Sequence, residues 1–185
     1  EIVIDKPSAI YDTTIYYLKE EIGEPYIDNQ GDTSYYIQRH IKFDLDNNWE
    51  LDKTWTAKNI WNTALKTEEN IKYVKIRFPA KKGFSWDGNI FNNLNEKEYE
   101  ITDINQRKMI NEIVFDSCMT VTHYNSSSLI HKDLEQEIFA INIGLVYKEI
   151  TSINSQEVIL DTPIEQRVTT ANIYIAEIVS YQTIE

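Results

Sequence analysis

Apolar and polar residues alternate along much of the chain with the period of two that is typical of β-strands. In segment 35–43 the odd positions are mostly large and apolar, whereas the even positions are mostly polar. Segment 49–61 repeats this pattern and has tryptophan at three odd positions. The intervening Asp46-Asn47-Asn48 is typical of turns, so the sequence predicts a β-hairpin here.

Further segments, four of them with less regular alternation, are also expected to be extended, which gives about nine or ten strands in all. They are residues 14–22, 74–78, 99–104, 112–122, 137–143, 145–153 and 173–181. A helix is an alternative for 62–70 and 129–136, although neither segment offers three turns of apolar stripe. We therefore predict an all-β, mostly antiparallel fold, as a curved up-and-down sheet or half-barrel, with a β-sandwich as the alternative.

Length and composition indicate one globular β-rich domain over residues 1–185. The chain has 185 residues, 42% of them hydrophobic, and a formal net charge of −12. A chain of this size can bury a sizeable core without a disulfide or a metal. The negative charge disfavours nucleic acid and anionic membrane surfaces as partners. The chain begins at Glu1 without Met, so we expect a trimmed or mature form whose signal peptide or lipidated cysteine would lie upstream.

No metal-binding or cofactor motif is recognisable, so we expect neither a metal nor a cofactor. His40, His123 and His131 do not show the spacing of a zinc site, and we expect them at the surface or at a rim. The segment 44–48 begins like a calcium loop, but Trp49 and Trp55 occupy the positions where that loop needs Gly and Glu. A hairpin turn explains the same residues.

Catalytic signatures are also missing from the sequence, and we expect a non-enzymatic protein. There is no G-x-S-x-G motif, and Ser126-Ser127-Ser128 is typical of a turn. Cys118, the only cysteine, is expected to be a buried or half-buried inert thiol, because no nearby positive charge lowers its pKa. Asp and Glu number thirty in total, and the sequence alone nominates no catalytic pair among them.

Trp49, Trp55 and Trp61 are the one feature on which function could depend. On a single strand their equal parity would place all three indoles on one face. The favoured interpretation is a core of large rings, which we expect above all for Trp55; Trp49 and Trp61 lie near the strand ends and could reach a rim. The alternative is one wall of a groove for an apolar or sugar ligand.

Several phrases of the sequence resemble uncharacterised lipoproteins of the Bacteroidetes, in the same order over about residues 14 to 181. The phrases are TIYYLKEEI (14–22), the 49–55 segment, FPAKKGFSWDGN (78–89) and GLVYKE (144–149). The resemblance implies export, a lipid anchor upstream of Glu1 and residence at the cell envelope, with the anchor as the only link to a membrane. The family's usual aromatic-rich start is missing. The Gly-x-x-Trp-x-Gly-Asn pattern at 83–89 has a structural explanation, with glycines at positive φ and a Trp that anchors the turn.

Three hypotheses for function follow. The first is a non-catalytic envelope lipoprotein domain that binds or scaffolds a partner. The second is a carrier that holds an apolar ligand in a concave sheet. The third is a domain that binds or hydrolyses glycans, which requires an aromatic platform and, for hydrolysis, two flanking carboxylates. An open or a filled face of the sheet would discriminate among them.

Overall fold

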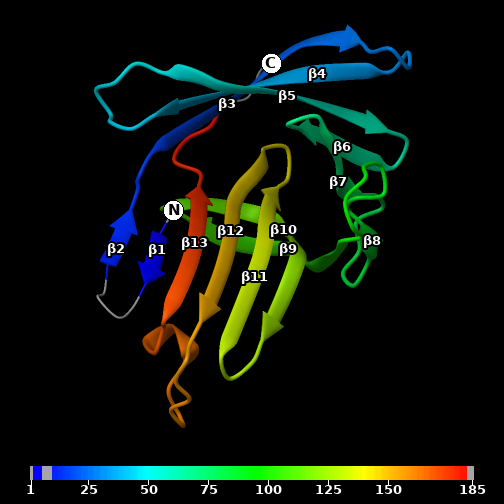
Figure 1. Ribbon diagram of the computed structural model, residues 1–185. Helices are drawn as coiled ribbons and strands as arrows, with labels where there is room; N and C mark the ends of the chain where they lie inside the picture. Colours follow the sequence, from blue (N-terminus) through cyan, green and yellow to red (C-terminus); the bar gives the residue numbers. More distant parts are fainter. Residues whose placement is uncertain (1, 6–9, 183–185) are drawn as a thin grey trace. The chain divides into compact units, whose positions relative to one another are not determined.

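The computed structural model describes residues 2–5 and 10–182, and this part of the chain is built almost entirely of β-strands (Figure 1). The strands form two antiparallel sheets that do not close into a barrel. The predicted all-β, mostly antiparallel fold is therefore confirmed. No helix among the described residues has the length and apolar character to cross a membrane.

The smaller sheet has five strands, and their order in the sheet is their order along the chain. The strands are β3 (Tyr17–Ile27), β4 (Thr33–Lys42), β5 (Glu50–Ile60), β6 (Thr63–Glu68) and β7 (Ile71–Arg77). Each strand pairs antiparallel with the next. This is an up-and-down sheet, and the predicted hairpin around Asp46 is the β4–β5 hairpin.

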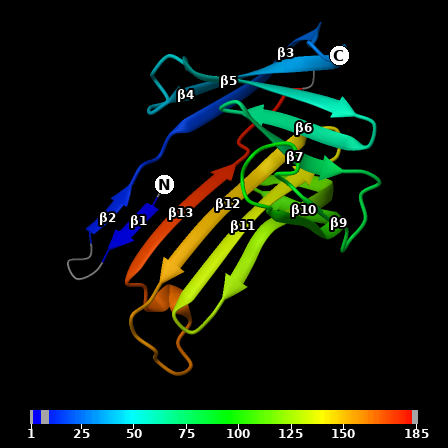
Figure 2. The same cartoon turned by 45° about the vertical axis from the view of Figure 1, so that its right-hand side comes forward.

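The larger sheet has eight strands in the order β2-β1-β13-β12-β11-β10-β9-β8, seen from a second side in Figure 2. The strands are β1 (Ile2–Asp5), β2 (Ile10–Thr13), β8 (Ser85–Asp87), β9 (Glu98–Ile110), β10 (Ile113–Ser127), β11 (His131–Ala140), β12 (Gly144–Asn154) and β13 (Thr170–Glu177). From β8 to β13 the order again follows the chain. The helical alternatives for 62–70 and 129–136 are wrong, because these segments supply β6 and much of β11.

Contacts divide the chain into two compact units. Unit 1 comprises residues 1–14, 81–85 and 99–185, and unit 2 comprises residues 15–80 and 86–98. Neither unit is one continuous stretch, because the chain enters unit 2 twice. A single domain over residues 1–185 stays a prediction.

Two apolar clusters stabilise unit 1. The first is built from side chains of β9 to β12, namely Ile110, Phe115, Cys118, Ile138, Ala140 and Val146. The second comprises Ile153, Ile164, Val168 and Ala171, and it includes the short 3-10 turn η1 (Ile164–Gln166). Complete burial of one such Ile, Val or Phe side chain contributes about 1.5–3 kcal/mol.

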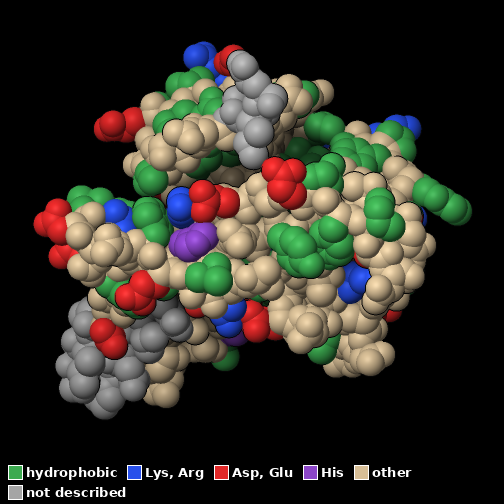
Figure 3. Space-filling view, turned by 90° about the horizontal axis from the view of Figure 1, so that it is seen from above, with side chains coloured by type: hydrophobic (Ala, Val, Ile, Leu, Met, Phe, Trp, Pro, Cys, Tyr) green, Lys and Arg blue, Asp and Glu red, His purple; other side chains and the backbone are tan. Residues whose placement is uncertain are grey.

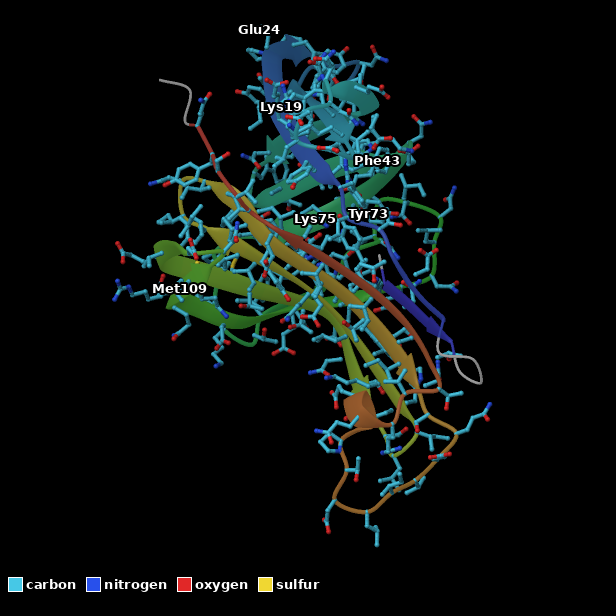
Figure 4. All side chains as sticks on the ribbon, turned by 90° about the vertical axis from the view of Figure 1, so that its left-hand side faces the viewer. Lys19, Glu24, Phe43, Tyr73, Lys75 and Met109 are labelled. Atoms are coloured by element: carbon cyan, nitrogen blue, oxygen red, sulfur yellow. The ribbon has the colours of Figure 1, made fainter. Side chains whose placement is uncertain are left out.

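The two edges of the five-stranded sheet are protected in different ways. Along β7, the backbone of Val74 is hydrogen-bonded by β8 and the loop that follows it. Gly88 O accepts a hydrogen bond from Val74 N, and Trp86 Nε1 donates one to Val74 O, each with a length of 2.9 Å. The other edge strand, β3, carries Lys19 and Glu24 (Figure 4) and is irregular between Ile22 and Pro25. Charges, bulges and proline all discourage another strand from adding to an edge.

Large apolar side chains also remain at the surface, for example Met109 on β9, which is 73% exposed. On the face shown in Figure 3, hydrophobic side chains form several separate patches with acidic and basic side chains between them. Scattered exposure of this kind is normal for a folded protein. We therefore looked for a site among polar clusters and cavities.

Candidate functional site

Lys58, near the C-terminal end of β5, is the centre of a buried polar cluster in unit 2. Its side chain is only 7% exposed. The ammonium donates to Asp28 Oδ2 over 2.6 Å, to Gln30 Oε1 over 2.7 Å and to Asp32 Oδ2 over 2.9 Å. These three partners use all three protons of the ammonium. The buried charge is thus fully compensated.

The three partners of Lys58 come from the β3–β4 turn, which also folds on itself. Asp28 Oδ1 accepts hydrogen bonds from the backbone N–H of Gln30 over 2.9 Å and of Asp32 over 3.0 Å. Ser34 Oγ donates to Asp28 Oδ2 over 3.1 Å. Gly31 has φ +83°, a conformation that glycine adopts without strain. The turn is therefore organised locally and presents its oxygens to Lys58.

Both members of the central ion pair are held in their charged forms. The hydrogen bond from Lys58 to Asp28, with further bonds from Asp32, Gln30 and Ser34, holds the pKa of Asp28 well below its usual range despite partial burial. Burial lowers the pKa of Lys58, but its bonds to Asp28 and Asp32 more than offset this, and the pKa lies above its ordinary value. Asp28 and Lys58 therefore both stay ionised at neutral pH.

A cavity of about 330 Å³ lies beside this cluster, and we call it the Lys58 pocket. It is lined by Tyr26, Asp28, Asn29, Gln30, Ser34, Thr56, Ala57, Lys58, Leu65, Thr67 and Lys72, all residues of unit 2. The cross-strand register explains this lining. Lys58 lies opposite Leu65, which lies opposite Val74, and these three form a buried row across the sheet.

The neighbouring row on the same face is polar and partly open. Tyr36 on β4 lies opposite Thr56 on β5, Thr56 opposite Thr67 on β6, and Thr67 opposite Lys72 on β7. The ring of Tyr36 also stacks on Tyr26, with centroids 4.4 Å apart and an interplanar angle of 17°. Because Tyr36 backs one face of the Tyr26 ring, the ring that lines the pocket is held in place.

The groups of the Lys58 pocket thus fall into two kinds. Lys58 and Ser34 both donate hydrogen bonds to Asp28, so these three side chains are held in place. In contrast, the side chains of Thr56, Thr67 and Lys72 make no hydrogen bond or ion pair with any residue that the structure describes. A pocket that has some polar side chains held in place and others able to bond to a ligand is suited to binding a small molecule.

The three tryptophans proposed as a possible ligand wall do not lie on one face. Arg39 lies opposite Lys53, but His40 lies opposite Leu51, so the β5 residue between them bulges out of the pairing. A bulge of one residue reverses the alternation of side chains along its strand. Leu51 therefore lies on the face of His40, whereas Trp55, opposite Ile37, lies on the other face.

Trp55 is a core residue, as predicted. It is 8% exposed, and its ring lies between Lys66 Nζ, 4.3 Å from the ring centroid, and the Arg39 guanidinium carbon, 4.9 Å away. Its Nε1 donates to Glu69 Oε1 over 3.2 Å. The hydrogen bond from Lys53, followed by that from Trp55, lowers the pKa of Glu69.

The other two tryptophans are outside β5. Trp49 precedes the strand, is 38% exposed, and lies near the ammonium groups of Lys42 and Lys19. Trp61 belongs to the β5–β6 turn, has φ 52° and is 99% exposed. The interpretation of a common wall is not supported by these environments.

A second hollow, of about 410 Å³, lies beside Trp55. It is lined by the consecutive residues 52–56 with Thr67, Glu69 and Asn70. Its charged groups are already paired, Lys53 Nζ with Glu69 Oε1 over 3.0 Å and Arg39 Nε with Asp52 Oδ2 over 3.8 Å. We regard it as the weaker candidate, because its side chains are engaged with one another.

The expectation of surface or rim histidines is wrong for His123, whose side chain is only 1% exposed. His123 is the extra residue of a bulge in β10, since Thr122 lies opposite Gln136 and Tyr124 opposite Glu135. Its Nδ1 is 3.0 Å from Glu135 Oε1 and its Nε2 is 3.4 Å from Glu137 Oε2. Tyr99 stacks on the imidazole with centroids 3.8 Å apart.

The other two histidines are partly exposed and separate from this group. His40 Nδ1 lies 3.4 Å from Glu21 Oε2, and His131 contacts Asn154 and Asp133. Hydrogen bonds with Asn154 and then Asp133 raise the pKa of His131. Within the described part of the chain, no three His, Cys, Asp or Glu side chains come together as a metal site would require.

The remaining sequence candidates have structural roles. Cys118 is buried, as predicted, and burial raises the pKa of its thiol. In the segment that begins like a calcium loop, Asp44 Oδ1 accepts from the backbone N–H of Asp46 over 3.3 Å. In the Gly83–Asn89 pattern, Gly83 has φ +80° and Trp86 is buried, as expected, but Gly88 does not have a positive φ, so that part of the expectation is wrong.

Comparison of the chain with known protein families, with curated proteins and with solved structures finds no match.

Proposed function

We propose that the protein is a non-catalytic binding module that holds a small polar ligand in the Lys58 pocket. The observation that carries the proposal is that two sets of polar side chains lie next to each other in the pocket. One set is already hydrogen-bonded within the protein, and the other is not. Lys58 and the β3–β4 turn are held together by hydrogen bonds, while the side chains of Thr56, Thr67 and Lys72 beside them make no hydrogen bond or ion pair with a described residue. Polar groups that are already fixed need little ordering when a ligand binds.

The ionisation of the pocket favours binding over acid–base catalysis. A glycosidase needs one carboxylic acid that is protonated near neutral pH. The carboxylate that lines the pocket is Asp28, whose pKa is held down by Lys58. A carboxylate that is paired with a buried lysine gives up its proton easily and is a poor general acid.

An apolar ligand fits the pocket less well. Its lining includes the charged residues Lys58, Lys72 and Asp28, and an apolar molecule would remove water from them without replacing the hydrogen bonds of that water.

The proposal also includes a location. We propose that the protein resides at the cell envelope, held by a lipid anchor upstream of Glu1. The support for this location is the resemblance of the four sequence phrases to Bacteroidetes lipoproteins.

Ligand-observed saturation-transfer NMR with a mixture of neutral sugars, amino acids, nucleosides and organic acids tests the proposal. We expect at least one compound to receive magnetisation from the protein and to lose it in Thr67→Tyr, which fills the pocket. Asn59→Tyr, which adds the same ring at an exposed position of β5, is the matched control and should leave the signal unchanged. If no compound shows a signal that depends on Thr67, the proposal fails.

A further inference from the structure

We infer that the ligand of the Lys58 pocket is a neutral, hydroxyl-rich sugar ring, an inference that rests on the function proposed above. The first reason is the charge balance of the pocket. Its lining holds two cations, Lys58 and Lys72, and the carboxylate of Asp28, and the carboxylate of Asp32 is bonded to Lys58 beside the pocket, so these four formal charges cancel. A ligand with a net charge would be buried against this neutral set without a counter-charge of its own.

The kinds of hydrogen-bonding groups give the second reason. Thr56 and Thr67 lie directly opposite each other on β5 and β6, and each hydroxyl can both donate and accept. Lys72, opposite Thr67 on β7, can only donate, whereas the side-chain amide of Asn29, which also lines the pocket, can both donate and accept. Sugar hydroxyls also donate and accept, so adjacent hydroxyls of one ring can satisfy this mixed row. An anion, which can only accept, would leave the oxygen atoms of both threonine hydroxyls without a donor.

The third reason is the tyrosine pair. The electron-rich face of an aromatic ring attracts groups with a partial positive charge, such as the C–H groups on one side of a pyranose ring. Tyr36 supports the Tyr26 ring from behind at 4.4 Å, and Tyr26 lines the pocket. An aromatic ring beside a row of hydroxyl groups presents the two kinds of surface that a sugar ring itself has.

The size of the pocket limits how much of a glycan it holds. About 330 Å³ is near the lower end of the range of roughly 300–1,000 Å³ that is typical of ligand sites. A single ring therefore occupies the pocket, and any longer glycan continues into solvent.

Isothermal titration calorimetry with defined probes tests this inference. The neutral probes are the hexamers of β-1,4-glucose, α-1,4-glucose, β-1,4-xylose and β-1,4-mannose, and the acidic probe is an oligogalacturonate of the same length. We expect saturable binding of at least one neutral probe and none of the acidic probe. Tyr26→Ala should weaken that binding about tenfold, equivalent to ~1.4 kcal/mol of lost contact. Tyr26→Phe, which keeps the ring, should stay within about twofold of the parent.

Control variants make the result specific to the pocket. Thr56→Val keeps the shape of the side chain but removes a hydroxyl, and it should also weaken binding. Tyr124→Ala removes an exposed tyrosine from β10 in the other unit and should change nothing. Each variant is first checked for a cooperative thermal transition near that of the parent. If Tyr26→Ala fails this check, Thr56→Val carries the test.

The outcomes separate this inference from the function on which it rests. If the acidic probe, or a charged compound of the saturation-transfer mixture, binds in a Thr67-dependent manner and no neutral probe does, the ligand class is wrong and the binding function stands. If a neutral hexamer binds equally well to Tyr26→Ala, Thr56→Val and Thr67→Tyr, the site is wrong. If nothing depends on Thr67 in either experiment, both proposals are overturned.

Discussion

Lys58 and Asp28, thirty residues apart in the chain, form an ion pair of 2.6 Å that ties the C-terminal end of β5 to the β3–β4 turn. Replacing the lysine by a methionine of similar length removes the cation and leaves two carboxylates facing each other. We expect Lys58→Met to lower the free energy of unfolding by about 2–3 kcal/mol. This is below the ~3–5 kcal/mol of a fully buried pair, because Asp28 and Asp32 retain some contact with water.

Urea unfolding of the parent and of Lys58→Met at pH 7 measures this loss. Lys53→Met is the matched control on the same strand, because the side chain of Lys53 is 42% exposed and its ion pair with Glu69 is worth little. A loss in Lys58→Met no larger than that in Lys53→Met would contradict the role of Lys58 as the organiser of the turn.

The same ion pair predicts a pH dependence of stability. The pKa of Asp28 is lower in the folded state than in the unfolded chain, where it is about 3.9. The unfolded state therefore takes up this proton first, and the stabilisation is complete above the unfolded pKa and decreases as the pH falls through and below it. We expect the difference in unfolding free energy between the parent and Asp28→Asn to be largest at pH 6–7 and to shrink towards pH 3.

Urea titrations at pH 7, 5, 4 and 3 measure this difference. Asp116→Asn is the control, since the Asp116 side chain is 92% exposed and its substitution should give a small difference at every pH. A difference for Asp28→Asn that grows on acidification would have the opposite sign and would contradict the assignment of a lowered pKa.

The three tryptophans predict three different losses of stability. Trp55 is buried between two cationic side chains, and Trp55→Ala should cost about 3–5 kcal/mol. Trp61 projects from a turn and touches little, so Trp61→Ala should stay within about 0.5 kcal/mol of the parent. Trp49→Ala should lie between them. Urea unfolding of the three variants gives the order, and equal losses in Trp55→Ala and Trp61→Ala would contradict it.

The sequence predicts the fold class well, because alternation and turn residues are local signals. The β4–β5 hairpin was identifiable because Asp46-Asn47-Asn48 separates two alternating runs. The arrangement of the tryptophans was not identifiable in this way. Residues at alternate positions of a strand share one face only where the strand pairs regularly with its neighbour. Which residue of β5 bulges depends on how β4 and β5 pair, and nothing within segment 49–61 records this.

The candidate site is less predictable still. The segment Asn29-Gln30-Gly31-Asp32 is recognisable as a turn, and the even positions of β5 are recognisable as the polar face. Lys58 then resembles any other solvent-facing lysine. Its burial follows from the contact between the turn and a strand almost thirty residues later, which no local pattern encodes. For the same reason, the periodicity of β10 gave no indication that His123 is buried.

Cys118 is expected to react slowly in the folded protein. It is 2% exposed, and burial raises the pKa of its thiol, so little thiolate is present at neutral pH and a reagent cannot reach it. Titration with a coloured thiol reagent at pH 8 should give less than about one tenth of the reaction rate that is seen in 6 M guanidinium. Equal rates in the two conditions would contradict the buried position of the side chain.

His123 should stabilise unit 1 through its nitrogen atoms as well as its ring. The imidazole stacks on Tyr99 and lies within 3.4 Å of both Glu135 and Glu137, and Glu137 is itself only 1% exposed and lies 3.2 Å from Lys148. His123→Phe keeps a ring for the stacking but removes both nitrogens, which leaves the carboxylates beside an apolar group. We expect it to lower the free energy of unfolding by about 3 kcal/mol, because removing one member of a buried charged or hydrogen-bonded set is more harmful than loss of the contact alone.

His131→Phe is the matched control, since the imidazole of His131 is partly exposed and water can replace its partners. It should lower the free energy of unfolding by less than about 1 kcal/mol. Urea unfolding of both variants at pH 7 makes the comparison. If His123→Phe proves as stable as the parent, the stacking on Tyr99 alone accounts for the conserved stability, and the nitrogens contribute nothing to it.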